Sequence, residues 1–368
     1  MNNHITKLEI NLNSLEFNLN YFKSKLKSTT KTLAVVKAFG YGSSAVEVSK
    51  FLADKVSYFA VAYLDEGIAL RKAGIINPIL VLHPVISNFE KLIEYQLEPN
   101  IYSFKLLNSF LTSAEKFSLN NYPIHIKFNT GLNRLGFNKN DIPKLTELLK
   151  LQTSIKVISI FSHIAASEDL NERDFTLNQI NNFKTMSTEL IKRLGYTPIK
   201  HMLNTSGIIN YASEAQFDMV RLGIGLYGFG NEDKETSKLK NVLTLKSIIS
   251  QIHTVQKGDS IGYNRAYKAT KTTKSATIPI GHADGISRQL GSKKGYIFIN
   301  NKKAPIIGNV CMDMIMADVT NIECNEGDEV IIYKNQFHIE DLAKNTNTIS
   351  YELITAISQR IKRVLIKS

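Results

Sequence analysis

In the first two thirds of the chain, short apolar runs alternate with longer stretches whose apolar positions recur at helical spacing. Several short runs are almost continuously apolar and rich in β-branched residues, which is typical of strands buried on both faces of a parallel sheet. Strand and helix follow one another eight times, and this order predicts an α/β fold, a (β/α)8 barrel of the TIM type. The predicted strands are residues 32–37, 58–62, 79–82, 100–103, 125–128, 157–163, 201–203 and 217–221.

Amphipathic segments lie between the predicted strands, and one further short run comes before them. Residues 7–12 are predicted to form an extra strand that need not belong to the barrel and is a candidate member of a C-terminal domain. The predicted helices include residues 45–55, 65–73, 142–151 and 174–194.

The pattern changes after Asn231. Residues 230–240 are polar and charged, as expected of a linker, and short strands with turn signals follow. We therefore predict two domains, the barrel over residues 1–238 and a mostly β domain over residues 239–368. Met312 and Met314 share one face of a predicted strand, where burial is the default. The strands predicted in this domain are 243–253, 276–280, 296–299, 304–307, 312–318 and 329–333, with one helix over 351–361.

The composition is that of an ordinary globular protein, with 43% hydrophobic and 21% charged residues. No apolar stretch approaches the roughly 20 residues of a membrane-spanning helix. The first residues show no basic segment followed by an apolar one, so no secretory signal is expected. Cys311 and Cys324 are the two cysteines of the chain, which excludes a disulfide framework, and their spacing does not suggest a metal site. We expect a cytoplasmic protein without a bound metal.

The formal charge of +12 at pH 7 raises the question of a nucleic-acid or membrane partner. The basic residues are mostly lysines and are scattered along the chain, without a run of five or six. A lysine-rich solubilising surface is favoured over a nucleic-acid footprint, and no membrane or nucleic-acid partner is predicted. The charge would still favour anionic small molecules.

Functional side chains of a parallel barrel gather at the C-terminal ends of its strands. Basic and polar side chains stand at or just after several of these predicted ends. They are Lys37 at the first strand, Lys127 and Arg134 at the fifth, His163 at the sixth, Asn204 and Thr205 after the seventh, and Arg221 at the eighth.

Lys37 ends a strand of apolar residues, where a lysine must be paired, reach solvent or take part in chemistry. A desolvated lysine holds its proton weakly and becomes a nucleophile toward carbonyls. A lysine that merely reaches solvent from a strand end is an equally good reading of this residue alone.

The segment AVVKAFGYG around Lys37 resembles the cofactor-lysine motif of the alanine racemases, which carry pyridoxal 5′-phosphate on that lysine. A single motif of this kind would be weak, but eight or nine in the family's order are a specific signal. The resemblance extends over nearly the whole chain, through IKFNTGLNRLGF, FSHIAAS, HMLNTSG, DMVRLGIGLYG, GDSIGYN, IPIGHADG, GNVCMDM and SYELITAISQR.

The resemblance implies a role in cofactor binding for each matching residue. Lys37 would hold the cofactor as an aldimine, and Arg221 would face its pyridine nitrogen, with His163 hydrogen-bonded nearby. The family's phosphate contacts match Tyr41, Asn204, Thr205, Gly223, Ile224 and Tyr351.

The resemblance also implies how alanine is bound and racemised. Arg134 and the backbone amide of Met312 would bind substrate, and Lys127 matches a lysine that is often carbamylated and positions the arginine. Lys37 would act as the base for D-alanine, and Tyr263 of the partner subunit as the base for L-alanine. Two bases on opposite faces are what racemisation needs. The active site would be shared across a homodimer that supplies D-alanine for peptidoglycan.

Several of these residues have a purely structural reading when they are taken singly. Tyr263 follows Gly-Asp-Ser-Ile-Gly, where a tyrosine is usually a strand or hairpin aromatic. His163 could be a structural histidine, and His201 is interpreted as a packing or supporting residue. Asp284 and Asp313 could be turn and cap residues.

The chain departs from the family pattern at five positions. Phe39 stands where the family commonly has Asn or Asp, and Asn129 replaces an acidic residue. Thr205 replaces a serine and keeps the hydroxyl. Asn309 and His282 replace an arginine and a tyrosine, which affects the substrate entrance rather than the chemistry.

Other functions remain open at this point. Amino acid decarboxylases of the same barrel architecture carry an acidic residue near the pyridine nitrogen, where Arg221 stands. A guanidinium has no acceptor and disfavours a proton on that nitrogen, which limits side reactions. Broad-specificity racemases are a second alternative, but they are typically exported, and no secretory signal is expected here. A non-catalytic protein that holds pyridoxal phosphate would be a single barrel without the domain that carries Tyr263.

Overall fold

A computed structural model describes residues 5–367, which fall into two compact units. Residues 18–40 and 45–226 form one, which we call the barrel unit. The described residues of 1–17, 41–44 and 227–367 form the other, which we call the sheet unit. Helix α1 (Leu12–Ser24) connects the first strand of the chain to the barrel.

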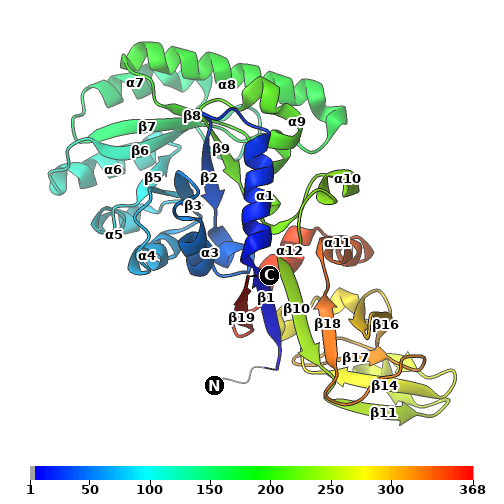
Figure 1. Ribbon diagram of the computed structural model, residues 1–368. Helices are drawn as coiled ribbons and strands as arrows, with labels where there is room; N and C mark the ends of the chain where they lie inside the picture. The colour runs from blue at the N-terminus through cyan, green and yellow to red at the C-terminus, as the bar shows by residue number, and fades with distance from the viewer. Residues whose placement is uncertain (1–4, 368) are drawn as a thin grey trace. The chain divides into compact units, whose positions relative to one another are not determined.

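Eight strands of the barrel unit close into a parallel barrel, which confirms the predicted fold class. Strands such as β3 and β4 are buried at every position, as strands covered on both faces must be. The strands run in chain order around the barrel (Figure 1). They are β2 (Lys31–Val35), β3 (Tyr58–Val61), β4 (Ile79–Val81), β5 (Glu98–Ile101), β6 (Tyr122–Lys127), β7 (Ile155–Phe161), β8 (Ile199–His201) and β9 (Met219–Leu222).

The helices between these strands bury one face each. In α6 the hydroxyl of Ser103 accepts a hydrogen bond from the Leu106 amide and caps the first turn. Helix α8 ends at Leu194 and is followed by Gly195, which has a left-handed φ of 80° and caps the helix. The helices are α3 (Ala45–Leu52), α4 (Leu64–Lys72), α5 (Phe89–Glu94), α6 (Phe104–Lys116), α7 (Ile142–Lys150), α8 (Arg173–Leu194) and α9 (Thr205–Ala215).

Seven of the eight barrel strands end one or two residues earlier than predicted, and two of these corrections concern site residues. Strand β2 ends at Val35, so Lys37 lies beyond the strand, at the start of the short helical segment α2 (Lys37–Tyr41). Strand β7 ends at Phe161, two residues before His163. The apolar run continues through Val36 after β2, whereas the polar Ser162 follows β7, so the hydrophobic pattern does not by itself mark where a strand ends.

The sheet unit is built on nine strands in the order β11-β14-β17-β16-β15-β18-β10-β1-β19. Strand β1 pairs antiparallel with β10 and parallel with β19, so the first strand of the chain belongs to this sheet. Strands β12 (Ser260–Ile261) and β13 (Tyr267–Lys268) form a separate pair. The nine are β1 (Lys7–Asn11), β10 (Leu243–Ile248), β11 (Gln251–Val255), β14 (Thr273–Ile278), β15 (Tyr296–Ile299), β16 (Lys302–Ile307), β17 (Ile315–Asp318), β18 (Glu329–Tyr333) and β19 (Lys362–Ile366).

The predicted strand 243–253 is in fact two strands, because the chain leaves the ladder between β10 and β11. Strand β17 begins at Ile315, so Met312 and Met314 precede it and are 60% and 48% exposed instead of buried. A loop without a ladder imposes no alternation of faces, which is why the prediction for these two side chains is wrong.

Helices of the sheet unit also differ from the prediction. The predicted helix 351–361 is α12 (Ser350–Thr355), which is shorter, and a short helix α10 (Asp233–Thr236) lies in the predicted linker. Helix α11 (Gln336–Asn345) was not predicted. Its sequence signal is Asn335, whose side chain accepts a hydrogen bond from the His338 amide and caps the helix.

No helix within residues 5–367 combines the length and the apolar character needed to cross a membrane.

Gly42 follows Tyr41 in the sheet unit and has no room for a side chain. Its φ is 82°, and a Cβ atom would lie 2.0 Å from the carbonyl oxygen of Ile354. The guanidinium of Arg363 donates to the Gly42 carbonyl at 2.8 Å and holds this backbone in place. The close approach of two backbones therefore determines where the segment of Tyr41 runs.

We expect Gly42→Ala to destabilise the protein by more than the cost of the left-handed backbone alone, which is about 1–2 kcal/mol. Gly258→Ala is the matched control, because Gly258 has a φ of 96° in the same unit and no atom within 4 Å of its added Cβ. Chemical unfolding of the two variants should show the larger loss for Gly42→Ala. Equal losses would contradict the close approach.

Candidate active site

Five basic side chains of the barrel unit gather at the C-terminal ends of the strands. Burial lowers the pKa of His163 well below its usual value, and the nearby charges of Arg221, Arg134, Lys127 and Lys37 lower it further. Arg221 also contacts His163 directly, with 3.1 Å between Nη2 and the acceptor Nδ1. The structure thus brings these predicted residues to one mouth of the barrel.

Lys37 begins a turn of unusual backbone conformation. Ala38, Phe39 and Gly40 have φ values of 53°, 55° and 64°, and Tyr41 is also left-handed. Each non-glycine residue in this conformation costs about 1–2 kcal/mol, so other contacts must hold the turn. The functional consequence is that the Lys37 side chain leaves the end of β2 in a defined direction.

The carboxylate of Glu66 holds this turn, and sequence reasoning missed it. One oxygen accepts from the Ala38 amide at 2.6 Å. The other accepts from the Ala62 amide at 2.7 Å and the Tyr63 amide at 3.3 Å. An acidic residue in the first turn of a predicted helix was the available signal, but only the structure connects it to the lysine turn.

The Lys37 amine has a lowered pKa. Burial is the main cause, the positive charge of Arg134 adds to it, and the negative charge of Glu66 works against it. A larger fraction of unprotonated amine is therefore present near neutral pH, which is the form that attacks carbonyl groups.

Lys127 is the last residue of β6 and is 7% exposed. Burial, followed by the charges of Arg221, Arg134 and Lys37, lowers its pKa to about 8. Its ammonium nitrogen lies 5.6 Å from the centre of the Phe161 ring. No ion pair of residues 5–367 includes Lys127, so its charge is not compensated by a carboxylate.

Arg221 projects from β9 and is 4% exposed. Besides His163, its guanidinium donates to the carbonyls of Ser162 and Met202, both at 2.8 Å. It also donates to Nδ1 of His201 at 2.9 Å. Burial, with a further contribution from Arg134, lowers the Arg221 pKa to about 9. His201 is thus a direct partner of Arg221, in agreement with its interpretation as a supporting residue.

The loops after β8 and β9 are fastened to each other. Asn204 caps α9 by accepting from the Gly207 amide at 2.8 Å. The hydroxyl of Thr205 accepts from the amides of Gly223 and Gly225 at 3.4 and 3.2 Å. Ile224, which lies between these glycines, is 4% exposed. A hydroxyl, several amides and the start of an 11-residue helix lie together here, which is a favourable arrangement for a phosphate.

Three tyrosines are packed together in the sheet unit. The ring centre of Tyr41 lies 6.1 Å from that of Tyr351 and 5.1 Å from that of Tyr227. Burial raises the pKa of Tyr41, and the neighbouring phenols raise it further. The Tyr41 hydroxyl is therefore protonated and able to donate a hydrogen bond.

Tyr263 is 73% exposed on a tightly turned segment of the sheet unit. Gly262, Asn264 and Arg265 all have positive φ values, of 77°, 58° and 50°. The side-chain amide Nδ2 of Asn309 donates to the backbone carbonyl of Tyr263 at 3.1 Å. Asn309 is one of the departures from the family pattern, and its contact shows that it supports the backbone of the tyrosine segment.

The segment around Met312 is held from two sides. The backbone carbonyl of Met312 accepts from the Ala283 amide at 3.0 Å. The backbone amide of Met312 donates to no acceptor within residues 5–367. Arg360 bridges Asp284 and Asp313, with 2.6 Å to each carboxylate. These two acids are thus partners of one arginine rather than only turn and cap residues.

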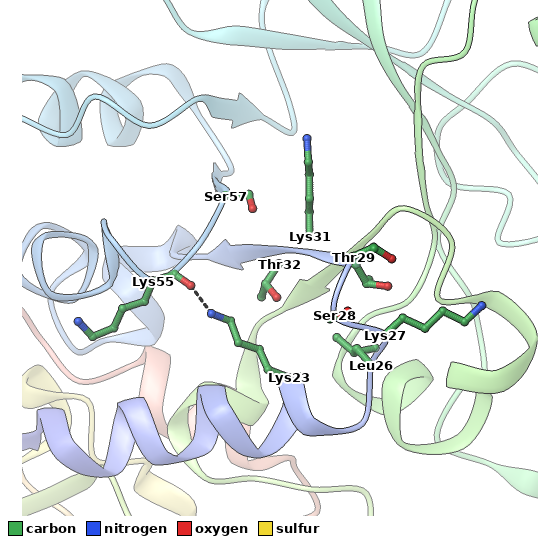
Figure 2. Close-up of a pocket in the computed structure, with 10 residues that line it drawn as sticks. Lys23, Leu26, Lys27, Ser28, Thr29, Lys31, Thr32, Lys55 and Ser57 are labelled. Carbon is green, nitrogen blue, oxygen red and sulfur yellow. Dashed lines mark hydrogen bonds between the residues drawn. The ribbon is translucent and has the colours of Figure 1, made fainter.

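A separate cavity of about 350 Å³ lies at the opposite end of the barrel, where β2 and β3 begin (Figure 2). Lys23 donates to the Lys55 carbonyl across it at 2.5 Å. The ammonium groups of Lys27, Lys31 and Lys55 extend away from it, so no charged groups converge there. The described residues also contain no group of three or more His, Cys, Asp or Glu side chains that could hold a metal.

The fold and the site define a class of protein: a parallel-barrel enzyme with basic groups at the barrel mouth and a β domain after it. The family model for the alanine racemase N-terminal domain matches residues 10–230, and that for the C-terminal domain matches residues 242–365. The chain therefore belongs to the alanine racemase family, which confirms the predicted isomerase class.

Individual relatives agree with this assignment. The chain is 34% identical to the alanine racemase of Clostridium kluyveri, over 98% of this chain and 93% of that protein. The structure of the Clostridium difficile alanine racemase has a TM-score of 0.93 at 35% identity, covering 100% and 97% of the two chains.

Two further alanine racemase structures contain small molecules. That from Bartonella henselae has covalently bound pyridoxal phosphate, with a TM-score of 0.88, 28% identity and coverage of 99% and 100%. That from Bacillus anthracis has bound L-Ala-P, with a TM-score of 0.90, 27% identity and coverage of 99% and 96%.

We expect Glu66→Ala to lower the free energy of unfolding by at least about 2 kcal/mol, because three backbone amides lose a charged acceptor. Asp65→Ala, at the neighbouring exposed position of α4, should change it by no more than about 0.5 kcal/mol. Chemical denaturation of both variants measures the difference. Similar stabilities would mean that Glu66 does not hold the lysine turn.

Proposed function

We propose that this protein interconverts L-alanine and D-alanine with pyridoxal 5′-phosphate held on Lys37. The observation that carries the proposal is a half-buried amine of lowered pKa at the mouth of a parallel barrel, where four further basic side chains gather. Membership of the family supports it, as do the bound pyridoxal phosphate and L-Ala-P of two related structures.

The residues of this chain fit the cofactor. The Lys37 amine would bind its carbonyl carbon, and Arg221 with His163 would lie at its pyridine nitrogen. The phosphate would be bound through Thr205, through the amides of Gly223 and Ile224, and through Asn204 at the start of α9. Thr205 already binds neighbouring amides as an acceptor, so its own O–H is directed elsewhere. The hydroxyls of Tyr41 and Tyr351 would complete the phosphate contacts.

When bound, the cofactor withdraws electrons from the substrate and makes its Cα proton acidic. The chain supplies the two bases that racemisation needs. The Nζ atom of Lys37 would hold or deliver the proton on the face of D-alanine. The phenol oxygen of Tyr263 would do so on the face of L-alanine. We assign cofactor binding to the domain of residues 1–238 and this second base to the domain of residues 239–368.

Tyr263 is 73% exposed, which suits a residue that serves a second chain. We propose a homodimer in which Tyr263 of the partner subunit completes each active site. The backbone of the tyrosine segment is held by Asn309, so its side chain can be presented outward without loss of position.

Arg134, the Met312 amide and Lys127 would handle the substrate. The amide of Met312 has no acceptor within the described chain and would bind the substrate carboxylate. A carbamate on Lys127 would carry a negative charge among Arg134, Arg221 and Lys37, where no carboxylate pairs with the lysine now. It would thereby align Arg134.

Arg221 also favours racemisation over decarboxylation or transamination. A carboxylate beside the pyridine nitrogen would hold it protonated and deepen the electron sink. A guanidinium offers only donors and would disfavour that proton, so Arg221 would make the bound cofactor a weaker acceptor of electrons. We place the reaction in the cytoplasm, where D-alanine would be supplied for peptidoglycan.

The shared site predicts complementation between two inactive variants. Lys37→Ala and Tyr263→Phe homodimers should each fail to racemise L-alanine in a chiral assay. A purified heterodimer should regain about half of the wild-type activity, because one of its two sites keeps both bases. Verified heterodimers that stay inactive would rule out the shared site.

The lowered pKa of Lys127 predicts a carbamate that depends on pH. A neutral amine adds CO₂ and releases a proton, and this amine is half neutral near pH 8 instead of near 10.5. With ¹³C-bicarbonate, a carbamate signal in the ¹³C NMR spectrum should grow as the pH rises through 8 and disappear in acid. Lys127→Arg keeps the charge but should lack the signal. A variant with an undiminished signal would assign it to another amine.

A further inference from the structure

A buried chain of hydrogen bonds leads away from the active-site arginine through the interior of the barrel. Arg221 Nη1 lies 2.9 Å from His201 Nδ1, and His201 Nε2 lies 2.9 Å from the hydroxyl of Ser159. That hydroxyl lies 2.6 Å from His125 Nδ1, and His125 Nε2 lies 2.7 Å from a carboxylate oxygen of Glu98. Each of the five consecutive strands β5 to β9 contributes one of these residues.

The strand register places the residues in line. His125 is paired directly with Ser159. Phe161, two residues beyond Ser159, is paired with His201. Arg221 lies two residues beyond the β9 residue that pairs with His201. Residues two apart in a strand share a face, so the hydrogen-bonded side chains all lie on one face of the staggered strands. Ser159, His125 and His201 are fully buried.

The arginine at one end dictates the direction of every hydrogen bond. A guanidinium has only donors, so Nδ1 of His201 must accept and its proton must lie on Nε2. The Ser159 hydroxyl then accepts from His201 and donates to His125 Nδ1. The proton of His125 is therefore on Nε2 and is donated to Glu98. In its other tautomer, His201 would place an N–H against the N–H of Arg221, and His125 would place a bare Nε2 against the carboxylate of Glu98.

Glu98, at the far end of this series of hydrogen bonds, supplies a negative charge that Arg221 lacks nearby. Arg221 forms no ion pair within residues 5–367, and Arg134 adds positive charge beside it. Glu98 is 8% exposed, and its carboxylate is held by the hydroxyl of Tyr58 and faces the charge of Arg71. Chains of aligned hydrogen bonds in a low dielectric polarise one another, so a carboxylate at one end strengthens donation along the whole chain.

We propose that Glu98, His125, Ser159 and His201 are positioning residues that direct Arg221 toward the pyridine nitrogen of the cofactor and provide its countercharge. This inference rests on the proposed function for the role of Arg221. The direction of the hydrogen bonds does not depend on the cofactor, because it follows from the protein side chains alone. His201 and His125 each accept a hydrogen bond on Nδ1 and donate one from Nε2, and so connect the guanidinium of Arg221 to the carboxylate of Glu98. These hydrogen bonds hold the guanidinium at a fixed distance from the cofactor.

The first test determines the tautomers in the protein loaded with pyridoxal phosphate. With ¹⁵N-labelled histidine, NMR should show a protonated Nε2 and an unprotonated Nδ1 for both His125 and His201. Ser159→Ala should shift both sets of resonances, because it removes the shared hydroxyl. Ser187→Ala, at a buried serine of α8 that donates to the Lys184 carbonyl, should leave them unchanged. A proton on Nδ1 of His201, or resonances that do not respond to Ser159→Ala, would overturn the proposal.

The second test removes the countercharge and keeps the shape. Glu98→Gln retains an oxygen that accepts from His125 but has no charge. We expect kcat for L-alanine to fall about tenfold with KM changed by less than about twofold, since the substrate contacts are untouched. Glu98→Asp, which restores the charge, should recover part of the loss, and Ser187→Ala should behave as wild type. A Glu98→Gln enzyme with wild-type kcat would overturn the countercharge role.

The two tests separate this inference from the proposed function. If the wild-type protein does not racemise alanine, the proposed function fails, and the tautomer measurement alone decides the hydrogen-bond chain. If the wild type racemises but the histidine tautomers differ from those derived above, the proposed function stands and the positioning role is wrong.

Discussion

The site depends on the burial of one guanidinium at the mouth of the barrel. Removing an arginine from water costs several kcal/mol unless its donors are satisfied and its charge is compensated. Arg221 meets the first need with two backbone carbonyls and two imidazoles. It has no adjacent carboxylate, and after burial its positive charge contributes to the lowered pKa values of Lys127 and His163.

Burial and neighbouring positive charges explain why two lysines of the site lose their protons easily and are good nucleophiles. Lys127 lies between three positive groups and Lys37 beside Arg134, and burial lowers the pKa of both amines. A neutral amine can attack a carbonyl or add CO₂, whereas an ammonium can do neither. The same basic surroundings suit a cofactor and a substrate that both carry negative charge. The left-handed turn after Lys37 is strained, and the carboxylate of Glu66 holds it in place by accepting a hydrogen bond from the Ala38 amide. Glu66 thereby fixes the direction of the Lys37 side chain.

The sequence pattern predicted the barrel well because parallel strands covered on both faces must be apolar throughout, and such runs are easy to recognise. It placed strand ends less well. Lys37 and His163 follow their strands instead of ending them, since the hydrophobic pattern alone does not mark the last residue of a strand. Helix α11 was missed because its capping residue, Asn335, was not recognised. The predicted burial of Met312 failed because no ladder imposes alternation there.

By itself, the sequence determined the fold class, the order of the elements and the set of basic residues at the strand ends, because these depend on local periodicity and position along the chain. Only the tertiary structure decided which groups meet. Glu66 and Ala38 are 28 residues apart and meet where the segments that follow β3 and β2 lie side by side. Glu98 and His125 are 27 residues apart and meet through the pairing of β5 with β6. The lowered pKa values follow from burial and summed charge, which no local pattern contains.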